Sequence, residues 1–123
     1  MTVQEFYAKI NGDYNEVLSR LMKEERILKY LKMFLVNEDI NLLDTSLASG
    51  NYSEAFRAVH SIKGVALNLA LAPLAKSGCE LCETLRNGQP TIDITQMVAD
   101  VHRDYDFVIE TIKELVNSEE VNG

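Results

Sequence analysis

The sequence predicts an all-α protein: an up-and-down antiparallel four-helix bundle with additional N-terminal helices packed on it. Apolar residues recur at helical spacing along most of the chain, and no stretch alternates between apolar and polar residues as a half-buried strand does. The two prolines, Pro73 and Pro90, fall at expected helix boundaries. Short connections between consecutive amphipathic helices favour antiparallel neighbours.

The N-terminal helices are predicted within residues 1–36. Thr2 with Glu5 forms a capping-box pattern, which is typical of a helix start. Asp13 with Glu16 can open a second helix in the same way. The sequence does not decide whether the helical pattern that follows is interrupted before it reaches the bundle.

The bundle is predicted over residues 38–117, after a turn. Its first helix is expected to run to about Ser49 and to end at Gly50. Asn51 with Glu54 forms another capping-box pattern, which opens the second helix of the bundle.

The remaining boundaries follow from proline and from polar caps. The second helix of the bundle is expected to end at Ala72, because the residue before a proline avoids the helical region, and Pro73 suits the first turn of the third helix. Asp93 with Gln96 is expected to open the last helix, which we predict to end near Asn117. The residues of this helix that we expect in or near the core are Tyr105, Phe107, Val108, Ile112 and Leu115.

Length and charge restrict the function. A chain of 123 residues with 46% apolar residues is expected to fold as one domain, 1–123, of which residues 118–123 form a frayed polar tail. The net charge of −7 disfavours binding to nucleic acid or to an anionic membrane. No apolar run approaches the roughly 20 residues of a membrane span, and no signal peptide is evident. With Cys79 and Cys82 expected as reduced thiols, we predict a cytoplasmic protein and, by default, a monomer.

His60, Lys63 and Gly64 are the most informative residues of the chain. Residues three and four positions apart on a helix are neighbours, so these three share one surface. A neutral imidazole is nucleophilic near pH 7, because its ordinary pKa is about 6.5, and a lysine beside it suits an anion. Glycine in a helix interior costs about 1 kcal/mol relative to alanine, so a steric reason is expected for it. Taken alone, His60 would be interpreted as an ordinary surface histidine and Lys63 as a solvated lysine. Together with Gly64, they favour an exposed histidine that accepts and passes on a phosphoryl group.

The same face of this helix also contains apolar residues. Phe56 and Leu67 lie beside His60 and away from the predicted core stripe. They predict either packing against the N-terminal helices or an exposed patch for a partner, and we take them with Ser61 as candidate docking residues. The alternative function is a non-catalytic helical interaction module that uses the Phe56 and Leu67 face, with His60 incidental.

The string Ala58-Val-His-Ser-Ile-Lys-Gly64 resembles the signature of histidine phosphotransfer (HPt) domains. The resemblance extends over roughly residues 13–115 and implies that His60 is phosphorylated, through its outer ring nitrogen. It implies that Lys63 pairs with the phosphoryl oxygens and that Gly64 gives steric clearance.

The resemblance also implies the partners: receiver domains of a hybrid sensor kinase or of a response regulator, whose aspartate exchanges the phosphoryl group with His60. Mg²⁺ is expected only on the receiver, and no cofactor is expected on this chain. Because the sequence lacks a Gly-rich nucleotide loop, we expect a phosphohistidine carrier without autokinase activity.

The sequence departs from the family pattern at three positions. Val65 replaces a small polar residue, and Ala70 replaces a glycine that many members have. Cys82, followed by Glu83, stands where members often have a glutamine or glutamate that assists the site. Cys82 and Glu83 are therefore our candidates for an auxiliary contact.

The two cysteines and two histidines do not predict a metal site. Cys79 and Cys82 have CxxC spacing, but the predicted helix runs through both and leaves no knuckle turn for zinc. We expect no bound metal, and we expect His102 to be a surface residue.

Overall fold

The computed structural model describes the backbone of residues 1–122 and the side chains of residues 1–118. Within this range the chain forms seven α-helices and no strand. The helices are α1 (Val3–Lys9), α2 (Tyr14–Leu21), α3 (Glu24–Phe34), α4 (Asp39–Ala48), α5 (Tyr52–Asn68), α6 (Ala72–Leu85) and α7 (Thr95–Asn122). No helix in the described range is both long and apolar enough to cross a membrane.

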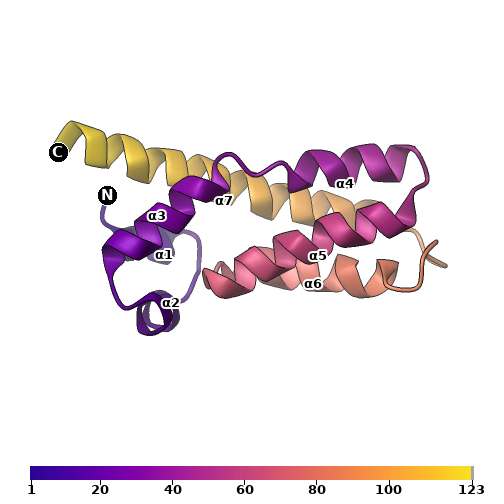
Figure 1. Cartoon of the computed structure of the whole chain (residues 1–123), viewed down its shortest axis with the longest axis horizontal. Coiled ribbons are helices and arrows are strands. Elements are labelled where there is room, and N and C mark those ends of the chain that lie inside the picture. Colours follow the sequence, from indigo (N-terminus) through magenta and orange to yellow (C-terminus); the bar gives the residue numbers. More distant parts are fainter. Residues whose placement is uncertain (123) are drawn as a thin grey trace.

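Helices α4 to α7 form the predicted up-and-down bundle (Figure 1). Helix α5 packs against α4 on one side and α6 on the other, and α6 packs against α7. The long α7 extends past the bundle, where α1 and α3 pack on it. The all-α fold class is thus confirmed, and the N-terminal helices lie at one end of the bundle, as expected.

Polar caps open the first, second and fifth helices at the predicted residues. Thr2 and Glu5 make both capping-box hydrogen bonds: the Thr2 hydroxyl oxygen accepts from the Glu5 backbone N–H, and the Thr2 backbone N–H donates to the Glu5 carboxylate. Asp13 accepts a hydrogen bond from the backbone N–H of Glu16, and Asn51 caps α5 in the same manner. These caps satisfy N–H groups that have no partner within the helix.

The question left open by the sequence is settled by a break between α2 and α3. Met22 adopts a left-handed conformation with φ of +73°, and Lys23 is extended. The chain therefore turns sharply here, and α2 and α3 are separate helices.

Helix α5 ends at Asn68, so the predicted end at Ala72 was wrong. Ala70 adopts a φ of +54°, and the Leu71 N–H turns back to the Ala66 carbonyl at 2.8 Å. This left-handed turn closes the helix before Pro73 is reached, and Pro73 lies in the first turn of α6. The glycine that many family members have at this position suits the same conformation at lower cost.

The last helix begins later and ends later than predicted. Asp93 accepts hydrogen bonds from the N–H and hydroxyl of Thr95, rather than capping toward Gln96. Helix α7 continues to Asn122, beyond the predicted end near Asn117, while the side chains of residues 119–123 lie outside the described range.

The core follows the predicted apolar stripes on α5 and α7, except at Phe107. On α5 the stripe residues Ala55, Ala58, Val59, Ile62 and Ala66 are buried. On α7 the buried residues include Tyr105, Val108, Ile112 and Leu115, at spacings of three and four. Phe107 falls between these positions and is 46% exposed, so its assignment to the core was wrong.

The N-terminal helices hold the C-terminal end of α5. The Tyr7 hydroxyl donates to the Leu69 carbonyl at 2.7 Å, and Arg20 donates to the carbonyls of Leu67 and Asn68, each at 2.8 Å. The last carbonyls of a helix have no partner within it, and they bear partial negative charge. The hydroxyl and the guanidinium therefore cap α5 and fix α1 and α2 to it.

Candidate functional site

His60 lies in the middle of α5 and is exposed. Helix α5 packs against α4 and α6 through its buried stripe, and the imidazole lies off this stripe and points outward. The ring packs against Phe56, with centroids 5.7 Å apart and an interplanar angle of 42°. Within the described residues, no hydrogen bond engages the imidazole nitrogens. Another molecule can therefore reach the nucleophilic atoms.

Phe56 connects His60 to a cation at the C-terminal end of α6. The Arg86 guanidinium lies over the Phe56 ring, 5.5 Å from its centroid, which is cation–π geometry. Arg86 is in turn bonded to both carboxylate oxygens of Glu83, at 2.6 and 3.2 Å. The hydrogen bond from Arg86 lowers the pKa of Glu83, with a smaller contribution from the charge of Lys63. Glu83 is therefore ionised and held by Arg86.

Lys63 is half-buried at the contact between α5 and α6. A Cβ added to Gly78 would lie 3.5 Å from the Lys63 Cα, so the lack of a side chain at Gly78 keeps the helices close together there. The Lys63 ammonium makes no hydrogen bond or ion pair with any described residue. It is a cation, three residues from His60, that remains available to an incoming anion.

Gly64 faces open space. A Cβ added at Gly64 would find no atom within 4 Å, apart from the backbone of its own helix. Packing within this chain therefore gives no reason for a glycine in the middle of α5. The space over Gly64 is open to a second molecule.

The cysteines of the CxxC pattern differ in exposure. Cys82 is buried on α6, and burial raises the pKa of its thiol against the opposing charges of Lys63 and Arg86. Cys82 is thus a neutral side chain inside the bundle. Cys79 is partly exposed, and both thiols are free. Within the described residues, no three His, Cys, Asp or Glu side chains gather as a metal site would require.

Ser61 connects the site to the turn before α4. Its hydroxyl donates to the Asp39 carboxylate at 2.7 Å, and the Asn37 amide donates to the same oxygen at 3.0 Å. The Tyr105 hydroxyl on α7 lies 2.9 Å from the Asn37 side-chain oxygen. This network fixes the residue next to His60 relative to α4 and α7.

The predicted docking residues differ in their surroundings. Leu67 is 47% exposed, whereas Phe56 is half-buried between Arg86 and His60. We predicted that this face either packs against the N-terminal helices or forms an exposed patch. The Leu67 side chain is exposed, while its backbone carbonyl accepts a hydrogen bond from Arg20 of α2.

The second histidine, His102, lies on α7, and its ring nitrogen is 2.6 Å from the Asp44 carboxylate of α4.

Sequence reasoning missed Arg86 and Asp39 as neighbours of the site. Both follow from the register of antiparallel helices. Residues at equal distances from the α5–α6 turn face each other, as Phe56 and Arg86 do. In the same way, Asp39 and Ser61 are equally far in sequence from Gly50.

A family model for the Hpt domain matches residues 29–118. This chain belongs to the Hpt family. The match covers the second half of α3, all of α4, α5 and α6, and α7 as far as residue 118, and it includes the helix that contains His60. Helices α1 and α2 lie outside it. Comparisons with curated proteins and with solved structures gave no significant match.

Membership in the Hpt family implies a role in phosphorelays, in which Hpt domains interact with receiver domains. The all-helical bundle agrees with this assignment.

Proposed function

We propose that this Hpt domain accepts a phosphoryl group on His60 from the phosphorylated aspartate of a receiver domain and passes it to an aspartate of a response regulator. The observation that supports the proposal most strongly is the arrangement on α5. An exposed imidazole lies beside the open space over Gly64 and an ammonium without a partner, Lys63.

The phosphoryl transfer needs only a nucleophile and a cation from this chain. The outer nitrogen of neutral His60 attacks the phosphorus of the aspartyl phosphate, the P–O bond breaks, and the aspartate leaves as a carboxylate. A P–N bond forms, and the imidazole loses its other N–H proton to water. The product adds negative charge beside Lys63, whose ammonium offsets it. The reverse of these steps delivers the group to the next aspartate.

One uncompensated cation near His60 suits an acidic partner site. Arg57 is paired with Glu54, and Arg86 is paired with Glu83, whereas Lys63 has no ion-pair partner among the described residues. A receiver aspartate, with the Mg²⁺ that we assign to the receiver, would meet the Lys63 ammonium and the clearance over Gly64. We propose that the carrier is a monomeric cytoplasmic protein without cofactor or autokinase activity.

Transfer from a phosphorylated receiver domain tests the proposal. The wild-type chain should take up label in an acid-labile, base-stable form, and His60→Gln should take up none. Lys63→Ala should slow the transfer at least tenfold while retaining the helical circular dichroism of the wild type. Equal labelling of wild type and His60→Gln would disprove the proposal. Partner binding without labelling of either would instead favour the non-catalytic interaction module.

A further inference from the structure

The His60 imidazole has no hydrogen bond that fixes its orientation. Within the described residues, neither ring nitrogen has a hydrogen-bonding partner. Cys82, which stands where family members often have a glutamine or glutamate, is a buried, neutral thiol. Both carboxylate oxygens of Glu83, the other candidate for an auxiliary contact, are bonded to Arg86. A nucleophile reacts fastest when it is held at a defined angle to its target, so another contact is needed to hold this ring.

The side chain against which the imidazole packs is Phe56. Side chains on an α-helix lean toward its N-terminus, so residue 60 leans over residue 56, one turn earlier. The two ring centroids are 5.7 Å apart and the rings are tilted by 42°. This separation lies within the range of about 4.5–7 Å in which aromatic rings attract each other. The contact restricts rotation of the imidazole, while His60 remains exposed to a partner.

The Phe56 ring is itself held by two contacts. It is half-buried and packs against the hydrophobic core of the bundle. The Arg86 guanidinium, which follows the last residue of α6, lies 5.5 Å from the ring centroid. A cation in this position is attracted by the negative charge of the ring face. The core and the guanidinium together leave the Phe56 ring little freedom to change its rotamer.

Glu83 fixes the position of Arg86. The two residues are three positions apart, which makes them neighbours on one helical surface. The guanidinium donates to both carboxylate oxygens, at 2.6 and 3.2 Å. Two parallel hydrogen bonds fix the plane of the guanidinium as well as its place. The Arg86 side chain, although 46% exposed, is therefore oriented over Phe56, and contacts run without interruption from Glu83 to His60.

Arg57 provides a comparison within the same helix as His60. It lies three residues before His60, and it pairs with Glu54 at a spacing of three residues and a distance of 3.1 Å. Among the residues whose side chains the structure describes, Arg86 alone has its guanidinium over an aromatic ring. Arg57 thus has the charge and the ion pair of Arg86 without the contact to Phe56.

We propose that Phe56 and Arg86 are positioning residues: Arg86, held by Glu83, fixes the Phe56 ring, and this ring orients the His60 imidazole so that its outer nitrogen meets the phosphoryl group. In this chain the packing contact takes the place of the glutamine or glutamate that often assists the site in family members. The proposal rests on the proposed function, because orientation affects the reaction only if this nitrogen attacks phosphorus. It acts on the rate of transfer and leaves the affinity for the receiver unchanged.

Labelling kinetics test the proposal, with the phosphorylated receiver that labels the wild type fastest within a panel as the probe. Phe56→Leu retains apolar bulk without the ring, and Arg86→Ala removes the cation. Each should lower kcat about fivefold with KM unchanged. Phe56→Tyr, which retains the ring, should keep at least half of the kcat, and the matched control Arg57→Ala should equal the wild type. The double variant should be no slower than Phe56→Leu, because Arg86 acts through the ring.

Three kinetic results would overturn the proposal. A rise in KM with kcat unchanged would make Phe56 a docking residue, losses that multiply in the double variant would show that Arg86 acts independently of the ring, and an equal loss in Arg57→Ala would reduce the effect to general charge.

Side-chain NMR tests the orientation without any transfer. Three-bond couplings of His60 should show one rotamer in the wild type and in Arg57→Ala, and averaging among rotamers in Phe56→Leu and Arg86→Ala. A wild-type imidazole that already averages would overturn the proposal. Absence of label on the wild type would overturn the proposed function instead, and the couplings would still decide whether Phe56 and Arg86 orient the ring.

Discussion

Gly64→Ala should make the protein more stable and less active. Alanine is favoured over glycine in a helix interior by about 1 kcal/mol. The added methyl group meets no atom within 4 Å outside its own helix, so no steric cost offsets the gain. For a domain of this length, about 1 kcal/mol corresponds to a rise in Tm of roughly 3–5 °C. Under the proposed function, an incoming phosphoryl donor needs the open space over Gly64, so the same methyl group should hinder the transfer.

Two measurements check this prediction. Thermal unfolding followed by circular dichroism should show the higher Tm, and labelling by a phosphorylated receiver should be slowed by about tenfold or more, or about 1.4 kcal/mol in the barrier. A lower Tm would show that the chain itself needs glycine at this position. A transfer rate equal to that of the wild type would show that the open space over Gly64 has no role in the reaction. Either result would refute the reasoning.

Three further predictions concern stability. Tyr7→Phe leaves the buried Leu69 carbonyl without its hydroxyl donor and should cost about 1–2 kcal/mol in urea unfolding, whereas an unchanged midpoint would show that this cap is unimportant. Gly12→Ala would place a methyl group 2.7 Å from the Ala70 carbonyl oxygen and from the Tyr7 ring, so a loss of about 1–3 kcal/mol is expected, and a gain in stability would contradict the close approach. Burial raises the pKa of Tyr105 to about 12, above its ordinary value of 10.0. The folded state therefore favours the neutral phenol, and its contribution to stability should be complete below pH 10 and be lost as the pH rises toward 12. Urea unfolding at several pH values measures this loss, which should be smaller in Tyr105→Phe.

The fold could be predicted where a local signal determines the structure. Thr2, Asp13 and Asn51 cap helices because their side chains satisfy N–H groups within the next turn, and this needs no distant partner. The end of α5 has no such signal. Alanine is uncommon in a left-handed conformation, and Ala70 is held there by tertiary contacts, including the Asp13 N–H on its carbonyl at 3.0 Å.

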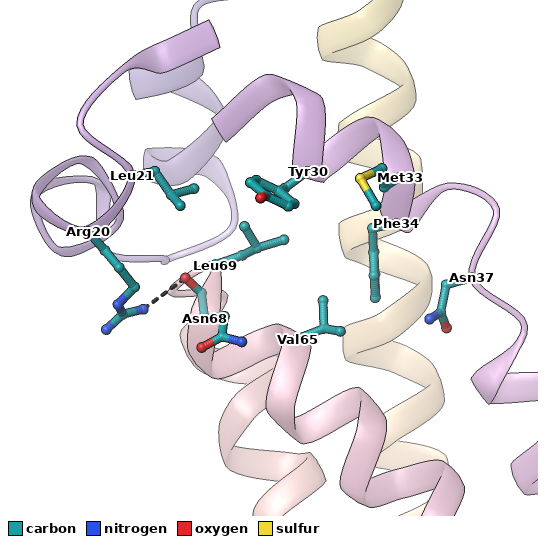
Figure 2. A pocket seen from close by; sticks show the side chains of 9 residues that line it. All are labelled: Arg20, Leu21, Tyr30, Met33, Phe34, Asn37, Val65, Asn68 and Leu69. Atoms are coloured by element: carbon teal, nitrogen blue, oxygen red, sulfur yellow. Dashed lines mark hydrogen bonds between the residues drawn. The ribbon is translucent and has the colours of Figure 1, made fainter. Parts of the chain in front are cut away.

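The candidate site likewise has one part that the sequence predicts and another that depends on tertiary packing. The neighbours His60, Lys63 and Gly64 are fixed by helical spacing alone, so the sequence predicts their shared surface. The positions of Arg86 over Phe56 and of Asp39 at Ser61 depend on how α4, α5 and α6 pair. The pocket lined by Leu21, Phe34 and Leu69 (Figure 2) could not be predicted, because it forms only where α2 and α3 meet the end of α5.

Identification of the phosphorylated residue tests the central claim most directly. The sequence contains two histidines, so His102 provides an internal control for His60. After transfer from a phosphorylated receiver domain, phosphorus NMR should show a phosphohistidine signal in the wild type and in His102→Gln, and none in His60→Gln. A phosphohistidine signal that persists in His60→Gln and disappears in His102→Gln would contradict the account.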